Sequence, residues 1–472
     1  MALSGIQIYK LLPQTNCKEC GFPTCLAFAM KLAAKQADLD KCPYVSDEAR
    51  ETLAESAAPP VRLVTLSSDG GDADRGRSGS GRREVKSGNE IVLFRHEKTF
   101  FNPAGVFIRV YDDQPLDEIK ARVEEAANYS VEYVGMDLTI DGFAVEATGD
   151  GDTFAAAVST VLETATLPLI LIASDAGVMG KGLQAAEGTR PLIYGATPDN
   201  WEGFAELARE HGAPMAIRAD SVSALAELTE KIKGAGVEEI VLDPGVRDPR
   251  SSLAMSTLIR RMALKKNFRP LGFPIINFPS ECARARAADG ALDGTSDEGM
   301  VAVAATQAIT KYGGFVVLDR FSPATIYPLL VLRSNIYTNP QEPIQVQPGL
   351  YEINDPQADS ALMVTTNFSI TYFSVANEID GSGIPGWLLV ADAEGMSVLT
   401  AWAAGKFDAE RIAKSVKTTG IADKISHRKL VLPGHVSVLL GELEEELPGW
   451  EILVGPREAV DLPGYLKVWS AG

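Results

Sequence analysis

Short apolar runs alternate with amphipathic stretches over most of residues 91–340. The runs have the length of buried strands, and the stretches between them repeat apolar residues at helical spacing. This alternation predicts a TIM (β/α)₈ barrel, with an open doubly wound sheet as the alternative. The predicted strands are Val106–Val110, Tyr133–Ile140, Leu167–Ala173, Leu192–Gly195, Met215–Arg218, Ile240–Leu242, Phe273–Phe278 and Phe315–Leu318. The predicted helices include Leu116–Ala127, Phe154–Thr164, Trp201–His211, Ser221–Ile232 and Ser252–Lys265.

The same alternation continues on a smaller scale in residues 341–472, after a stretch interrupted by prolines. It predicts a small α/β domain with a parallel sheet, of the flavodoxin-like or Rossmann-like type. Ligands of such sheets bind beyond the carboxyl ends of the strands, so the residues that follow each strand are candidates for a binding site. The predicted strands are Leu362–Asn367, Trp387–Ala391, Lys429–Leu432 and Trp450–Val454.

The amino-terminal part has a different pattern. Residues 1–57 contain two short helical patterns, one beginning near Thr24 and one following Ser46. Residues 58–90 are rich in Gly, Ser, Arg and Asp, a composition that buries little apolar surface. We therefore predict a flexible linker at 58–90, with a basic docking strip as the alternative.

Four of the five cysteines lie in the amino-terminal segment, at Cys17, Cys20, Cys25 and Cys42. The spacing is C-x₂-C-x₄-C, followed later by Cys42 and a proline. Four thiolates around one centre favour an iron–sulfur cluster or zinc, and a proline after the last cysteine recurs in ferredoxin-type sites. Structural zinc sites usually pair two short Cys knuckles, whereas this segment has one, so the pattern favours a [4Fe–4S] cluster over zinc.

Charge and hydropathy exclude several classes of partner and location for the chain. The formal net charge is −19, which argues against nucleic acid and anionic membranes as partners. No apolar run is long enough to predict a transmembrane helix, and the first residues do not resemble a signal peptide. Clustered cysteines in such a chain indicate metal rather than disulfides, so we expect a cytoplasmic redox protein.

The remaining chemistry-bearing residues give weaker signals. Asp243 and Asn277 follow barrel strands, where barrel active sites lie, but they form no recognisable catalytic set. His435 follows a strand and begins a helix, which favours a capping role. The other candidates are isolated along the sequence and are expected to be structural: Cys282, His96, His211 and His427.

Several motifs together resemble the large (gamma) subunit of the corrinoid iron–sulfur protein. That protein belongs to the reductive acetyl-CoA (Wood–Ljungdahl) pathway of anaerobic carbon fixation and to the related acetyl-CoA decarbonylase/synthase complex. The resemblance covers essentially the whole chain. The segments that show the resemblance are Asn16–Met30, Cys42–Tyr44, Val364–Ser369, Ser397–Ala401 and Val454–Ala459.

The resemblance implies an α/β multidomain fold and two cofactors. Residues 1–57 would form a [4Fe–4S] module, 58–90 a linker, 91–340 a TIM barrel, and 341–472 a corrinoid-binding domain. Cys17, Cys20, Cys25 and Cys42 would hold the cluster. The chemistry would occur at cobalt rather than at a catalytic side chain. The expected corrinoid contacts are Thr366, Asn367, Phe368, Ser369, Thr371, Tyr372, Gly395, Ser397, Val398, Leu399, Gly434, His435, Gly455, Pro456 and Arg457.

The family's function is that of a corrinoid-dependent methyl carrier, a methyltransferase-type activity. It implies a heterodimer with a small subunit, a methyltransferase that uses methyltetrahydrofolate or another pterin, acetyl-CoA synthase as acceptor, and a reductive activator. The cluster would return inactive Co(II) to Co(I). The barrel would then serve as scaffold and interface.

A corrinoid without a histidine beneath the cobalt, in the base-off form, is expected. Base-off cobalamin enzymes that do use such a ligand have a D-x-H-x-x-G pattern, whereas Asp392–Gly395 contains no histidine. Two alternatives remain open at this point. One is an iron–sulfur electron-transfer subunit that binds no corrinoid, and the other is a barrel methyltransferase acting directly on a folate or pterin.

Overall fold

The computed structural model describes residues 5–33, 36–46, 49–50, 53, 59–68, 84–133, 136–288, 297–338 and 344–469. The chain divides into two compact units, Met1–Tyr129 with Thr139–Tyr337 and Ser130–Leu138 with Thr338–Gly472. Most of the helix predicted after Ser46 and the centre of the predicted linker, 69–83, lie outside the described residues. Within the described residues, every helix is too short or too polar to cross a membrane.

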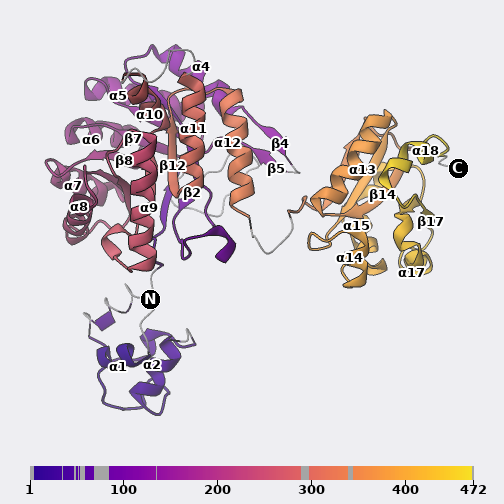
Figure 1. The fold of residues 1–472 in the computed structure, drawn as a ribbon, viewed down its shortest axis with the longest axis horizontal. Helices are drawn as coiled ribbons and strands as arrows, with labels where there is room; N and C mark the ends of the chain where they lie inside the picture. The colour runs from indigo at the N-terminus through magenta and orange to yellow at the C-terminus, as the bar shows by residue number, and fades with distance from the viewer. Residues whose placement is uncertain are drawn as a thin grey trace. The chain divides into compact units, whose positions relative to one another are not determined.

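The cysteine-bearing segment is built from two short helices around a small apolar core (Figure 1). They are α1 (Gly5–Leu11) and α2 (Cys25–Ala33), and a 3₁₀ turn, η1 (Leu39–Lys41), follows them. The core is formed chiefly by Ile8, Leu12, Phe28, Ala29, Cys25 and Cys42.

Part of the predicted linker is an ordered hairpin, so the linker prediction is wrong for those residues. β1 (Val64–Ser67) pairs antiparallel with β2 (Glu84–Ser87). Val64, Leu66 and Val85 are buried and join the apolar interior of the barrel. They alternate with polar residues, which is the period of a half-buried strand, and the Gly/Ser/Arg-rich composition around them hid this signal.

The middle of the chain is a closed barrel of eight parallel strands, which confirms the predicted TIM barrel over the open sheet (Figure 1). Around the barrel the order is β10-β11-β12-β3-β6-β7-β8-β9. The interior holds side chains from alternate positions, such as Phe107, Ala144, Ile170 and Phe315. The strands are β3 (Gly105–Tyr111), β6 (Gly142–Glu146), β7 (Leu169–Ile172), β8 (Leu192–Ala196), β9 (Met215–Arg218), β10 (Ile240–Asp243), β11 (Ile275–Asn277) and β12 (Gly313–Leu318).

Helices follow each strand and surround the barrel (Figure 1). Side-chain caps fix where several of them begin. The Asp248 carboxylate accepts from the Ser251 N–H at 2.9 Å, and Pro249 occupies the first turn. The helices are α4 (Leu116–Ala127), α5 (Gly151–Thr164), α6 (Ala176–Ala185), α7 (Trp201–His211), α8 (Val222–Gly234), α9 (Pro249–Lys265), α10 (Pro279–Ala288), α11 (Asp297–Thr310) and α12 (Pro323–Ile336), with 3₁₀ turns η2 (Arg95–Glu97) and η3 (Arg269–Leu271).

The predicted second barrel strand, Tyr133–Ile140, is wrong. This segment contributes to an antiparallel hairpin, β4 (Val131–Tyr133) with β5 (Met136–Leu138), and the barrel strand is β6. The hairpin strands alternate between partly buried and exposed side chains, whereas the residues of β6 are almost all buried. By its contacts the hairpin belongs to the C-terminal unit, where Tyr133 packs against the core.

The C-terminal unit contains a five-stranded sheet in the order β13-β15-β14-β16-β17. The four predicted strands are present and parallel, and the sequence missed β13, which pairs antiparallel at one edge. The strands are β13 (Gly349–Ile353), β14 (Ala361–Thr366), β15 (Gly386–Ala391), β16 (Lys429–Leu432) and β17 (Glu451–Val454).

Helices cover both faces of this sheet, because alternate strand residues face two separate cores. Leu362 and Val364 pack with α15, while Met363 on the other face packs with α13 and α18. The helices that follow β14 and β15 in the sequence therefore cover opposite faces of the sheet. The helices are α13 (Ser369–Ser382), α14 (Val398–Ala403), α15 (Ala409–Thr418), α16 (Ile421–Lys424), α17 (Leu440–Glu446) and α18 (Leu462–Leu466), with η4 (Gly434–Leu439) and η5 (Ala459–Asp461).

Candidate functional site

The four clustered cysteines belong to one small module but differ in exposure. Cys25 and Cys42 are buried, Cys20 is partly buried and Cys17 is exposed. Among the described residues, no three His, Cys, Asp or Glu side chains are grouped closely enough to hold a metal ion. The four thiols are thus brought into one module without being gathered around one point.

The loop before α2 is nevertheless arranged around Cys25. The side chain of Asn16 accepts from the Cys25 N–H at 2.8 Å, and the Asn16 N–H donates to the Cys25 Sγ at 3.4 Å. Lys18 and Gly21 have positive φ, which allows the chain to curl between the first cysteines. A backbone donor to a cysteine sulfur is the interaction that stabilises thiolate ligands of clusters, so this donor set fits an iron–sulfur group.

Tyr44 links the loop of the first cysteines to the last one. Its hydroxyl donates to the Glu19 carboxylate at 3.0 Å. This hydrogen bond and the Glu19 charge raise the pKa of Tyr44, with smaller contributions from the charges of Cys17 and Cys42. The hydrogen bond thus joins the loop between Cys17 and Cys20 to the segment after Cys42.

The fifth cysteine, Cys282 on α10, lies apart from this module. It is buried, and burial raises the pKa of its thiol to about 11.

Because of that pKa, Cys282 should resist alkylation. About a thousandth of this thiol would be ionised at pH 8, and iodoacetamide reacts with the thiolate. We expect Cys282 to stay unlabelled in native protein at pH 8 and to react about tenfold faster per pH unit up to pH 11, as followed by peptide mass spectrometry. Rapid labelling at pH 8 would contradict this prediction, with unfolded protein as the labelled control.

The C-terminal unit has a groove of about 290 Å³ beyond the carboxyl ends of its strands. It lies at β14 and β16, the neighbouring strands where the sheet order reverses, which is where doubly wound sheets bind ligands. Of the residues predicted from the sequence, eight line the groove: Thr371, Ser397, Val398, Leu399, His435, Gly455, Pro456 and Arg457.

The other predicted contacts do not line the groove. Asn367 is buried, and its side-chain oxygen accepts from the N–H groups of Ala393 and Gly395 at 2.9 and 3.0 Å. It thereby joins the end of β14 to the loop after β15. Tyr372 packs in the core under α13. The predicted residues that do not line the groove are Thr366, Asn367, Phe368, Ser369, Tyr372, Gly395 and Gly434.

Sequence reasoning missed part of the lining. Thr365 faces the groove, and its buried hydroxyl has no hydrogen-bond partner. An unpartnered buried hydroxyl is costly unless a ligand satisfies it, so this atom fits a polar group of a bound cofactor. The neighbouring Thr366 hydroxyl is also buried without a hydrogen-bond partner among the described residues. The other missed residues are Met363, Val364, Ile370, Ser374, Val375, Val431, Leu432, Pro433, Glu458, Ala459 and Leu462.

Two loops at the far side of the groove touch through their backbones. A Cβ on Gly434 would lie 2.6 Å from the Gly455 carbonyl oxygen and 2.9 Å from Pro456 backbone atoms. Only glycine at position 434 permits this approach. Beside it, the His435 Nε2 lies 3.5 Å from the Glu458 carboxylate.

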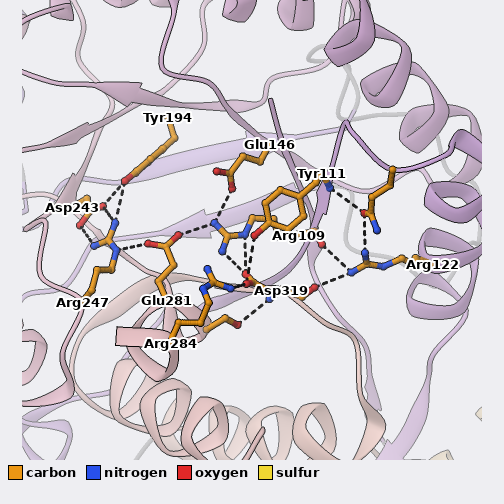
Figure 2. A network of polar contacts seen from close by, with 12 residues as sticks. Arg109, Tyr111, Arg122, Glu146, Tyr194, Asp243, Arg247, Glu281, Arg284 and Asp319 are labelled. Atoms are coloured by element: carbon orange, nitrogen blue, oxygen red, sulfur yellow. Dashed lines mark hydrogen bonds and ion pairs between the residues drawn. The ribbon is translucent and has the colours of Figure 1, made fainter. Parts of the chain in front are cut away.

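The barrel carries a network of charged side chains at the carboxyl ends of its strands (Figure 2). Arg109 of β3 is almost fully buried and pairs with Glu146, Glu281 and Asp319. Arg247 pairs with Glu281 and with Asp243, which also accepts from the Tyr194 hydroxyl at 2.6 Å. Sequence patterns do not predict this network, although a charged residue, Arg109, inside the apolar run Val106–Val110 is a signal.

Each carboxylate of this network pairs with an arginine. Burial raises the pKa of Glu146 against the opposing effect of Arg109. Burial alone would lower the pKa of Arg247, but the hydrogen bond and charge of Asp243 raise it well above its usual range. Asp243 is thus an ion-pair partner and not a free acid or base. Asn277 is outside the network.

Comparisons with known proteins cover the whole chain. A family model described as the CO dehydrogenase/acetyl-CoA synthase delta subunit matches residues 77–466, and one described as an Fe-S cluster matches residues 12–44. The corrinoid/iron-sulfur protein large subunit of Moorella thermoacetica is 42% identical over 99% of this chain and 99% of its own. The chain belongs to this family of large subunits. The resemblance stated from the sequence motifs is thereby confirmed.

Other members of the corrinoid/iron–sulfur large-subunit family are named as parts of an assembly. The gamma subunit of the acetyl-CoA decarbonylase/synthase complex of Methanopyrus kandleri is 37% identical over 98% of this chain and 97% of its own. Among solved structures, dihydropteroate synthase of Thermus thermophilus is 16% identical, with a TM-score of 0.38 over 51% of this chain and 100% of its own.

Proposed function

We propose that the chain is a methyl carrier that binds a corrinoid in the groove of its C-terminal unit and a [4Fe–4S] cluster on Cys17, Cys20, Cys25 and Cys42. The bound corrinoid would supply a cobalt that takes a methyl group from methyltetrahydrofolate or another pterin through a methyltransferase and passes it to the nickel of acetyl-CoA synthase. The cluster would supply electrons that return Co(II) to Co(I). The chief support is the relative named for both cofactors, which is 42% identical along the whole chain.

The groove supports the corrinoid half of the proposal. Its four parallel strands follow the order of a flavodoxin-like sheet, whose ligands bind at the reversal of strand order. Ser397 and Thr371 present hydroxyls there, and the buried Thr365 hydroxyl has no hydrogen-bond partner among the described residues. Gly434 permits the close backbone contact between the loops after β16 and β17, and both loops line the groove. These residues would hold the corrinoid through its amide side chains and apolar edge.

The size of the groove supports a partner that covers the corrinoid. At about 290 Å³ it lies at the low end of ligand pockets and is too small to enclose a corrin ring. Ile370 and Val438 are each 67% exposed on the elements around it. A small subunit, forming a heterodimer, would cover this apolar rim. The methyltransferase, acetyl-CoA synthase and a reductive activator would then approach in turn.

A cobalt and iron count with a visible spectrum tests the proposal. Protein purified without oxygen, with its small subunit, should contain about four iron and one cobalt per chain and show a base-off corrinoid spectrum. His435→Gln should leave that spectrum unchanged, because the proposal places no histidine on cobalt. A spectrum altered by His435→Gln would contradict the base-off assignment alone.

The same measurement separates the carrier from an electron-transfer subunit. Iron without cobalt, even after incubation with a corrinoid, would overturn the corrinoid site and leave the cluster as the working group. Cobalt without iron would overturn the proposed cluster on the four cysteines and leave the proposed corrinoid site in the groove.

A further inference from the structure

The barrel has a cavity of about 490 Å³ at the carboxyl-terminal end of its strands, beside the charged network. It is walled by β3, by the loop after β12, by α4 and by α10, and Ile108 and Phe321 form its apolar part. Three arginines line it, Arg122, Arg284 and Arg320. This is an unusual concentration of positive charge in a chain whose formal net charge is −19.

Two of the three arginines of this cavity, Arg122 and Arg320, are not neutralised in the way that those of the adjacent network are, whereas Arg284 pairs with Asp319. Arg122 is half-buried, and it donates only to neutral acceptors: the Gln114 side chain at 2.8 Å and the backbone carbonyls of Asp319 and Arg109 at 2.8 and 3.4 Å. Among the described residues, no carboxylate pairs with Arg122 or with the exposed Arg320. A partly buried guanidinium without a counter-charge favours an anionic ligand.

The acidic residues of the cavity do not cancel this charge. Asp319 is already shared by Arg109 and Arg284, and it accepts from the Tyr111 hydroxyl at 3.5 Å. Figure 2 shows Arg122 and Arg284 approaching Asp319 from opposite sides. Glu125 is the one other carboxylate of the lining, and it is exposed to solvent. Three guanidiniums against two carboxylates leave the lining with a net positive charge.

The position of the cavity is one that barrels use for anions. Arg284 lies on α10, after the seventh strand, and Asp319 to Phe321 follow the eighth strand. Barrel phosphate sites commonly form from the loops after these two strands. The carboxylates of the adjacent network are held by arginines, so the cavity offers binding groups rather than a free catalytic acid or base.

We propose that this cavity binds a small oxyanion, an organic phosphate or a polycarboxylate, through Arg122, Arg320 and the outer edge of Arg284. The site is separate from the corrinoid groove and does not depend on the function proposed above. A bound oxyanion would add donors to those that Arg122 already satisfies, because a guanidinium has five N–H groups and two of its nitrogens are engaged.

Calorimetric titration of the full-length, anaerobically purified chain tests the site. Inorganic phosphate, pyrophosphate and citrate are titrated separately at constant ionic strength, against sodium chloride as the non-specific reference. We expect saturable binding that falls at least about tenfold in Arg320→Gln and in Arg122→Gln. Lys120→Gln, which removes an exposed positive charge from the same helix, should bind as the unaltered chain does.

The choice of probe distinguishes the ligand classes. Binding of phosphate or pyrophosphate alone would indicate an organic phosphate, and binding of citrate alone a polycarboxylate. No saturable binding of any probe, or equal loss in Lys120→Gln and the arginine variants, would overturn the proposal. Arg320 is exposed and has no partner among the residues that the structure describes, so its variant tests the site even if Arg122→Gln is unstable.

Discussion

A Cys42→Ser variant should lose most of its iron and fail to reduce its corrinoid, while keeping its cobalt. Cys42 is buried in the apolar core of the module, where a serine oxygen is a poor ligand for iron. Loss of a residue that hydrogen-bonds to a metal ligand lowers the affinity for the metal by about 10–100-fold. Loss of a direct ligand should therefore lower the affinity by more than about 100-fold. Iron analysis and the rate of reduction to Co(I) measure the two effects.

The module should also lose its fold in this variant. A segment of fewer than about 70 residues has too little core to fold without a metal or cross-link. Cys282→Ser removes a thiol of similar burial outside the module and should leave iron and reduction unchanged. Full iron content in Cys42→Ser would remove Cys42 from the set of cluster ligands.

Gly434→Val should abolish corrinoid retention and leave the iron content unchanged. A Cβ at position 434 would lie within 3.0 Å of backbone atoms of Gly455 and Pro456, which have no flexible end that can move aside. The loops after β16 and β17 would separate, and both line the groove. We expect cobalt per chain to fall more than about tenfold, since a displacement of this size removes several contacts at once.

The matched control is Gly441→Ala on α17, where a new Cβ would meet nothing within 4 Å. This variant should retain its cobalt and be slightly more stable, because alanine favours helix. Normal cobalt in Gly434→Val, with an unchanged melting temperature, would show that the two loops do not position the corrinoid.

Much of the fold was predictable because its elements are regular. The barrel strands are continuous buried apolar runs between helices, and the four parallel strands of the C-terminal sheet have the same signature. The errors fall on one strand that lies next to a stronger signal and on one that lacks a buried apolar run. β6 begins at a glycine and follows a more conspicuous hairpin, and β13 is an edge strand with only partly buried side chains.

The candidate sites were predictable to different degrees. The cysteine spacing is local, so the sequence alone names its four members. The groove is assembled from the ends of several strands and the loops after them, so the sequence predicts eight of its lining residues and leaves out others such as Thr365. The network around Arg109 joins residues up to 210 positions apart, which local patterns do not connect.

Because of the β4–β5 hairpin, the C-terminal unit is formed from two separate segments of the sequence. Residues 130–138 leave the barrel, pack with the C-terminal sheet through Tyr133, and return. The backbone therefore passes between the two units three times, after Tyr129, after Leu138 and after Tyr337. A fragment beginning near residue 340 would lack the hairpin and expose the surface it covers. In evolution, too, this unit could be exchanged as a module only together with an insertion in the barrel.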